Sequence, residues 1–153
     1  MRRKFATDLY ELMKKDKNII LIVGDLGYGM LDKIRDNIPN QFYNVGAAEQ
    51  SAICVGIGLA LRGKIPVVYS ITPFLIFRPF EAIRNYIDHE SIPVIMVGAG
   101  RGDDYISCGF SHNANDHNIL RQFKNINFIE PKDDFSLSEI VYSAQPVYLN
   151  LGR

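Results

Sequence analysis

The stretch "NVGAAEQSAICVGIGLALRGKIPVVYS", residues 44–70, joins a long uncharged run to a short run rich in valine. The first run, from Gln50 to Leu61, holds no charged side chain and is long enough for about three helical turns. The second run, 65–70, has the length and composition of a strand that is buried on both faces of a sheet. The stretch therefore predicts a buried helix that leads directly into a buried strand.

The same alternation continues along the chain. Further strand-like bursts lie at 18–24, 92–98, 126–130 and 146–151, and helix-like segments lie at 3–15, 49–61, 79–89, 115–123 and 135–143. This alternation predicts an α/β fold, in which a mainly parallel sheet is covered by helices on both faces. With 153 residues, the chain is expected to form a single domain, 1–153.

The carboxyl ends of the predicted strands are the expected place for a ligand site. In open parallel sheets, ligands bind in the crevice beyond these ends. We therefore expect the loops after Val23, Asn44, Ser70 and Val97 to lie close together.

The balance of charge limits the classes of partner. Lys plus Arg and Asp plus Glu each total 17, so no overall field attracts nucleic acid or an acidic membrane surface. The uncharged run is shorter than the ~20 residues of a membrane span, and the N-terminal segment turns acidic too early for a signal peptide. We expect a cytoplasmic protein, in which Cys54 and Cys108, lacking a CxxC spacing, are free thiols.

Small residues recur every four positions along the predicted helix, at Ala52, Gly56 and Ala60. One face of the helix is therefore nearly smooth, and another backbone can approach it closely. Both a core helix and a subunit interface fit this pattern.

Glu49 stands at the head of the uncharged helix and has two interpretations. A carboxylate in the first turn is stabilised by the helix dipole and needs no function. However, Ala47, Ala48, Ala52 and Ile53 surround it in the sequence, and apolar neighbours favour a protonated carboxyl. Such a group can share a proton with a nitrogen atom of a ligand.

Three aromatic residues, Phe74, Phe77 and Phe80, follow the strand at intervals of three. Pro73 and Pro79 prevent one uninterrupted helix through them, so we expect some of these rings to lie in a loop. The rings could belong to the core or could stack on a flat heterocycle at the edge of the sheet.

The segments after two other strands lack the common nucleotide and metal motifs. "VGDLGYG", residues 23–29, is not followed by the Lys of a Walker loop, and no helix opens at Gly102 as a dinucleotide fingerprint requires. His112, Asp116 and His117 do not have the spacing of a zinc site. His112 is instead a candidate substrate contact or proton donor.

Three segments together resemble the pyrimidine-binding domain of transketolase and related thiamine diphosphate enzymes. They are "NVGAAEQSAICVGIGLALRG", "TPFLIFRPFEAIR" and "CGFSHNANDHNILRQFKNINFIEPKDD", and the similarity extends from about Asn18 to Arg153. The resemblance implies that Glu49 hydrogen-bonds N1′ of the cofactor's aminopyrimidine and favours its imino tautomer. It also implies two-carbon ketol transfer between sugars.

The resemblance assigns further roles residue by residue. Phe74 matches the position that stacks on the pyrimidine, and Phe77 and Phe80 match the rest of its aromatic pocket. Asp25 and Leu26 match a pair that lines the cofactor cleft. The substrate contacts implied are His112, Ser111 of the same motif, Cys108 and Arg153.

Three departures from the family pattern concern the substrate. Cys108 replaces an aspartate that contacts the sugar, and Gly29 and Gly100 stand where transketolases place a serine and a histidine around the substrate phosphate. A ketose other than a simple pentose phosphate is therefore expected, for example one carried on a nucleotide.

The sequence lacks the GDG motif and downstream asparagine pair that hold Mg²⁺ and the cofactor's diphosphate in this family. The resemblance therefore implies a separate diphosphate-binding subunit, in a heterotetramer with a homodimeric core. The chain also ends where the pyrimidine domain ends, as the small subunit of a split enzyme would. Two alternatives stay open, namely the pyrimidine subunit of a sulfopyruvate- or phosphonopyruvate-type decarboxylase and a non-catalytic assembly module.

Overall fold

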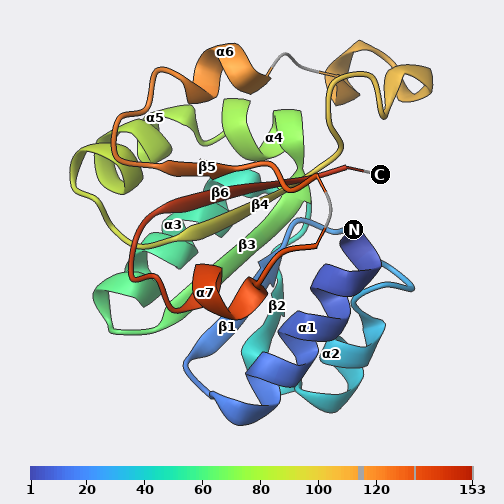
Figure 1. Cartoon of the computed structure of the whole chain (residues 1–153), viewed down its shortest axis with the longest axis vertical. Coiled ribbons are helices and arrows are strands. Elements are labelled where there is room, and N and C mark those ends of the chain that lie inside the picture. The colour runs from blue at the N-terminus through green and yellow to red at the C-terminus, as the bar shows by residue number, and fades with distance from the viewer. Residues whose placement is uncertain (114–115, 133, 153) are drawn as a thin grey trace.

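The computed structural model describes residues 1–113, 116–132 and 134–152, built around a six-stranded, fully parallel sheet (Figure 1). Its strands are β1 (Ile19–Val23), β2 (Phe42–Asn44), β3 (Ile65–Ile71), β4 (Ile95–Ala99), β5 (Asn127–Ile129) and β6 (Val147–Leu151), in the order β2-β1-β3-β4-β6-β5. The predicted α/β fold is confirmed. The prediction missed β2, a three-residue edge strand that is largely exposed.

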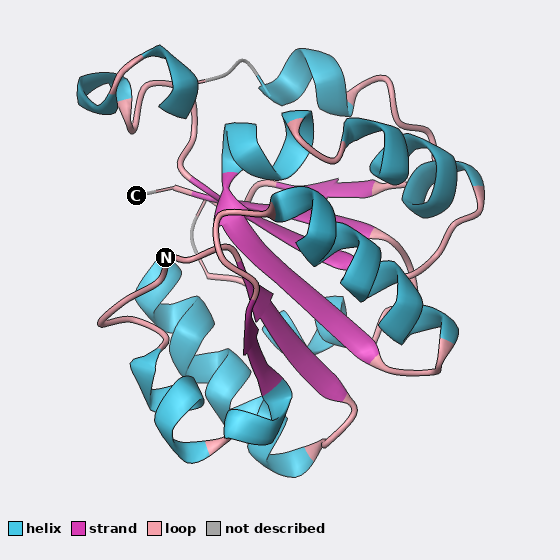
Figure 2. Ribbon diagram, turned by 180° about the vertical axis from the view of Figure 1, so that it is seen from behind, coloured by secondary structure: helices cyan, strands magenta, loops and turns pink. Residues whose placement is uncertain are grey.

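Helices cover both faces of this sheet (Figures 1 and 2). One face carries α1 (Arg2–Lys15), α2 (Asp32–Asn37) and α7 (Leu137–Val141). The other carries α3 (Glu49–Leu61), α4 (Thr72–Phe77), α5 (Phe80–Ala82) with the π-helix η2 (Ile83–His89), and α6 (Asp116–Leu120). Short 3-10 turns are η1 (Pro39–Gln41), η3 (Ile106–Cys108) and η4 (Phe110–His112). Within the described ranges, none of the helices has the length and apolar character of a membrane span.

Side chains along β3 alternate between the two halves of the core. Val67 and Tyr69 join the cluster under α1, whereas Val68 joins the cluster under α3. Every residue of β1, β4 and β6 is buried. This is why the strands read as continuous apolar runs in the sequence.

The smooth face of α3 lies against the sheet. Ala52 and Gly56 are buried, and a Cβ atom on Gly56 would stand 3.0 Å from Cγ2 of Val68. The small residues therefore let the helix approach β3 closely, as the core-helix interpretation of this pattern requires.

The aromatic segment is helical, contrary to the expectation that some of its rings lie in a loop. Phe74 and Phe77 belong to α4, and Phe80 is the first residue of α5. Pro73 lies in the first turn of α4, where a missing N–H group costs nothing. The expected interruption occurs only at Arg78 and Pro79, between the two helices.

Tyr69 gives the fold a testable dependence on pH. Its side chain is 1% exposed and burial raises its pKa from 10.0 to about 12. Between these values the unfolded chain loses the proton and the folded chain keeps it, so the stabilisation is complete below pH 10 and is lost as the pH rises to 12. In urea titrations at successive pH values, the free energy of unfolding of the wild type should fall by up to ~1.4 kcal/mol per pH unit more than that of Tyr69→Phe in this window.

The matched control is Tyr86→Phe, since Tyr86 is half exposed. This variant should follow the wild-type curve across the same range of pH. Parallel curves for wild type and Tyr69→Phe would show that burial does not hold the proton on Tyr69.

Candidate functional site

Glu49 is buried at the point where the ends of β1, β3 and α4 meet the start of α3. Its side chain is 1% exposed, and the Ser70 hydroxyl on β3 donates a hydrogen bond of 2.8 Å to Oε1. The Arg78 guanidinium, just beyond α4, donates to Oε2. Gly24 leaves room on the third side, since a Cβ atom there would stand 3.1 Å from Oε1.

The surroundings of Glu49 differ from the apolar environment predicted from its sequence neighbours. Arg78 is a cation and Ser70 a hydroxyl donor, and both lie more than twenty positions away in the chain. Sequence reasoning missed both residues. Arg78 in particular lies between Phe77 and Pro79, where nothing indicates a partner 29 residues earlier.

Phe74 is the aromatic residue that the structure brings to this group. The guanidinium carbon of Arg78 lies 4.2 Å from the centroid of the Phe74 ring, and the His112 ring contacts the same ring edge-on with 5.0 Å between centroids. Phe77, in contrast, is half exposed, and Phe80 packs against Phe123 with 5.7 Å between centroids.

His112 therefore reaches the site through Phe74. It ends the short turn η4, and Ser111 Oγ lies 3.2 Å from its Nδ1 atom. Cys108 is an exposed free thiol in η3. The fourth predicted substrate contact, Arg153, lies outside the described residues.

Asp25 and Leu26 lie in the loop after β1, directly after Gly24, which leaves room for Glu49. Asp25 has a positive φ of 54°, and its N–H donates to Oδ1 of Asn44 at 3.1 Å. Hydrogen bonds from the Tyr28 hydroxyl and from Asn44 hold the pKa of Asp25 below its ordinary value. The loops after β1 and β2 are thus joined, as their shared edge of the sheet predicts.

A second arginine joins the segments at the ends of β4, β5 and β6. Arg101, in the loop after β4, donates hydrogen bonds of 2.7 Å to the carbonyls of Pro131 and Asn150 and pairs with Glu130 at 3.4 Å. It thereby ties the segments that follow β4 and β5 to the end of β6. Sequence reasoning missed this arginine too, since it contacts backbone carbonyls that leave no pattern.

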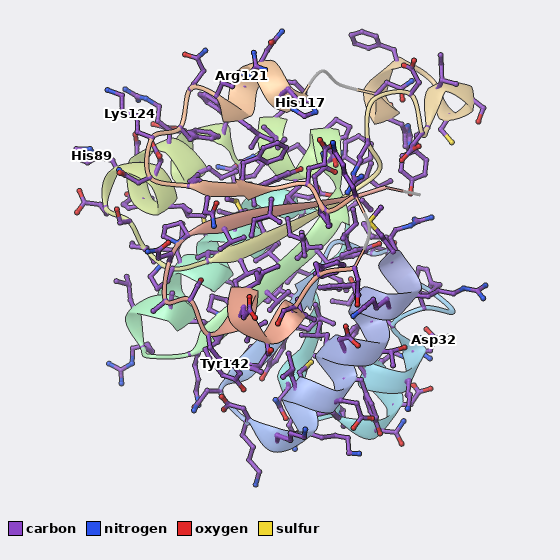
Figure 3. All side chains as sticks on the ribbon, in the orientation of Figure 1. Asp32, His89, His117, Arg121, Lys124 and Tyr142 are labelled. Carbon is purple, nitrogen blue, oxygen red and sulfur yellow. The ribbon has the colours of Figure 1, made fainter. Side chains whose placement is uncertain are left out.

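His117 lies on α6 (Figure 3). Its Nε2 atom stands 3.5 Å from Glu130, and its ring meets Phe128 edge-on. Over residues 1–113, 116–132 and 134–152, no three His, Cys, Asp or Glu side chains gather as metal ligands would.

The fold and the site together define a class of protein: a parallel α/β domain whose strand ends gather a buried helix-start glutamate, a phenylalanine and a histidine. The family described as "Transketolase, pyrimidine binding domain" matches residues 1–149. The chain belongs to this family.

Relatives and a solved structure extend this assignment. A "Putative transketolase C-terminal section" of Methanocaldococcus jannaschii is 31% identical, over 100% of this chain and 50% of the relative. A subunit of the apulose-4-phosphate transketolase of Phocaeicola vulgatus is 30% identical, over 99% of this chain and 51% of the relative. The structure "Split gene transketolase, inactive beta4 tetramer" matches with a TM-score of 0.83 at 30% identity, over 99% of this chain and 50% of that one.

The chain thus spans about half the length of these relatives. Homologues of this chain are transketolase-type enzyme subunits, and the predicted split-transketolase relationship is confirmed at this level. The extent of the domain, 1–153, and the roles of the individual site residues stay predictions.

Proposed function

We propose that this chain is the pyrimidine-binding subunit of a split, thiamine diphosphate-dependent transketolase-like transferase. The observation that carries the proposal is the pair of contacts made by Arg78. Its flat guanidinium donates an N–H group to Glu49 and lies over the Phe74 ring. Glu49 and Phe74 thus already contact a planar group with nitrogen-bound hydrogens, and the cofactor's aminopyrimidine combines the same two features.

In this proposal each side chain of the group has one task. Glu49 hydrogen-bonds the N1′ position and holds a proton there, while Ser70 fixes its other oxygen. Phe74 stacks on the ring, and Arg78 moves aside to make room for it. When bound, thiamine diphosphate supplies the electron sink for two-carbon ketol transfer between sugars.

We assign the remaining predicted residues to contacts with the cofactor and with the sugar substrate. Asp25, Leu26, Phe77 and Phe80 line the cofactor, and His112, Cys108, Ser111 and Arg153 contact the sugar substrate. The edge contact between His112 and Phe74 supports a histidine next to the cofactor. Its two ring nitrogens suit it to exchange a proton with a sugar hydroxyl.

The other half of the cofactor site is assigned to a separate diphosphate-binding subunit, which also holds Mg²⁺. One relative is named as a subunit of a transketolase and another as a transketolase C-terminal section, and both names support this division. We place the two chains in a heterotetramer with a homodimeric core. These relatives are transketolases rather than decarboxylases, so the decarboxylase alternative gains no support from them.

Calorimetry with and without the partner tests the split site. Thiamine diphosphate and Mg²⁺ should bind this chain weakly, because charge-assisted contacts to diphosphate and metal supply most of the affinity. The mixture with the diphosphate-binding subunit should bind the cofactor and form a stable complex, because ligand and partner favour the same state. Tight, Mg²⁺-dependent binding by this chain alone would contradict the proposal.

A further inference from the structure

A groove runs beside the carboxyl end of the sheet, along the first turns of α1 and the loop after β1. It consists of two adjoining hollows of about 310 and 500 Å³, which share Arg3, Tyr28 and Met30 in their walls. Arg2 and Tyr105 line the inner hollow, and Lys33 lines the outer one. We call it the basic groove, defined by Arg2, Arg3, Tyr28, Lys33 and Tyr105.

The basic groove begins at the strand ends that carry the candidate site. Ile71 of β3 lines the inner hollow, and the residue before it, Ser70, holds Glu49. Leu26 lines the same hollow and follows Asp25 in the chain. The groove and the Glu49 group thus lie on the two faces of one strand end, so one extended substrate could reach both.

The walls of the groove are positively charged. Arg2, Arg3 and Lys33 contribute cations, and none of the described residues that line either hollow is acidic. Arg2 Nη1 donates a hydrogen bond of 2.8 Å to the Tyr105 hydroxyl, and Lys33 Nζ is held 4.0 Å from the centroid of the Tyr10 ring. One guanidinium group can donate hydrogen bonds to two oxygens of a phosphate at once. Two arginines and a lysine in these walls therefore favour a ligand with more than one negative charge.

Tyr28 adds an aromatic surface between the two hollows. It is 66% exposed, and its hydroxyl donates to Asp25, which fixes the end of the side chain. An anchored aromatic ring beside cations suits a ligand that joins a flat heterocycle to phosphate groups.

Tyr105 closes the inner end of the groove. Gly100 has a positive φ of 92°, and a Cβ atom on it would overlap the Tyr105 ring. The ring therefore occupies the space that a side chain at position 100 would need. A long ligand must extend from there toward Lys33, into the larger outer hollow.

We propose that the basic groove binds the nucleoside diphosphate portion of a nucleotide-linked sugar substrate. The phosphates contact Arg2, Arg3 and Lys33, and the base stacks on Tyr28. This inference names the substrate class of the proposed transferase and therefore rests on that function.

Binding of free nucleotides to this chain tests the groove without cofactor or partner. UDP, CDP, ADP, GDP, ribose 5-phosphate and inorganic phosphate are titrated by calorimetry. At least one nucleoside diphosphate should bind at least ~10-fold more tightly than ribose 5-phosphate or phosphate, since it alone uses the ring and both hollows. The double variant Arg3→Gln, Lys33→Gln should bind that nucleotide at least ~10-fold more weakly. Tyr28→Ala should also bind the nucleotide more weakly, but its affinity for inorganic phosphate should be unchanged.

The control is Arg62→Gln, because Arg62 is an exposed arginine that follows the end of α3; binding should be unchanged. Equal affinity for nucleotides and ribose 5-phosphate would overturn the proposal in favour of a simple sugar phosphate, and absence of nucleotide binding would overturn it outright. Cofactor binding in the two-subunit mixture is measured separately, so failure of the groove and failure of the proposed function give different results.

Discussion

Replacing Glu49 by glutamine is expected to lower the turnover of the assembled enzyme by at least ~10²-fold, the scale of losing a positioned acid–base group. Glutamine has nearly the same shape and can still accept the Ser70 hydrogen bond, but it cannot exchange a proton with N1′. The fold should survive, because Arg78 is 43% exposed and water can solvate it once its partner is neutral. Steady-state turnover with saturating cofactor measures the effect.

Glu139→Gln is the matched control. Glu139 also lies in the first turn of a helix, α7, but it is exposed. Its replacement removes the same helix-dipole interaction, worth about 0.3–1 kcal/mol, and should leave turnover unchanged. Near-normal turnover of Glu49→Gln would remove Glu49 from the chemistry and favour the assembly-module alternative.

Gly98→Ala is expected to destabilise the protein more than other single-methyl changes, by about 3 kcal/mol. The added Cβ atom would overlap the hydroxyl of Tyr148 and stand 2.7 Å from Thr72 Oγ1 and 2.9 Å from Tyr148 Cζ. Tyr148 is fully buried and cannot retreat. Thermal unfolding should show a melting temperature about 6–12 °C lower, and cofactor binding in the two-subunit mixture should weaken, because Thr72 begins the helix that carries Phe74.

Gly58→Ala adds the same methyl group at a position with open space and serves as the comparison. Gly58 lies on the outer side of α3, and nothing stands within 4 Å of a Cβ atom there. Alanine should stabilise this chain by about 0.5–1 kcal/mol through its better helix propensity. If both variants shifted the melting temperature in the same direction, close packing around Gly98 would not account for the effect of Gly98→Ala.

The elements that the sequence predicted well are those with a strong local signal. The strands β1, β3, β4 and β6 are buried on both faces and therefore appear as apolar bursts. The helix α3 begins at Glu49, one residue before its uncharged run, and ends with that run at Leu61. For these segments, burial alone determines both the composition and the structure.

The elements that were missed depend on context. β2 is an edge strand of only three residues, of which Tyr43 and Asn44 are exposed and Phe42 is partly buried, so its backbone pairing leaves no clear apolar signature. α4 contains a proline that is harmless only because it lies in the first turn. Arg78 is the clearest case, since a partly exposed arginine in an aromatic segment gives no indication that it contacts a buried acid from another helix.

The alternation along β3 limits the positions at which members of this family can differ in length. Val68 and Ser70 face the side of Glu49, whereas Tyr69 and Ile71 face α1 and the groove. Inserting or deleting one residue within β3 would exchange these two sets, because side chains alternate at every position of a strand. Changes in length among homologues should therefore be confined to the turn at Arg62, Gly63 and Lys64, and the number of residues from Val67 to Ile71 should stay constant.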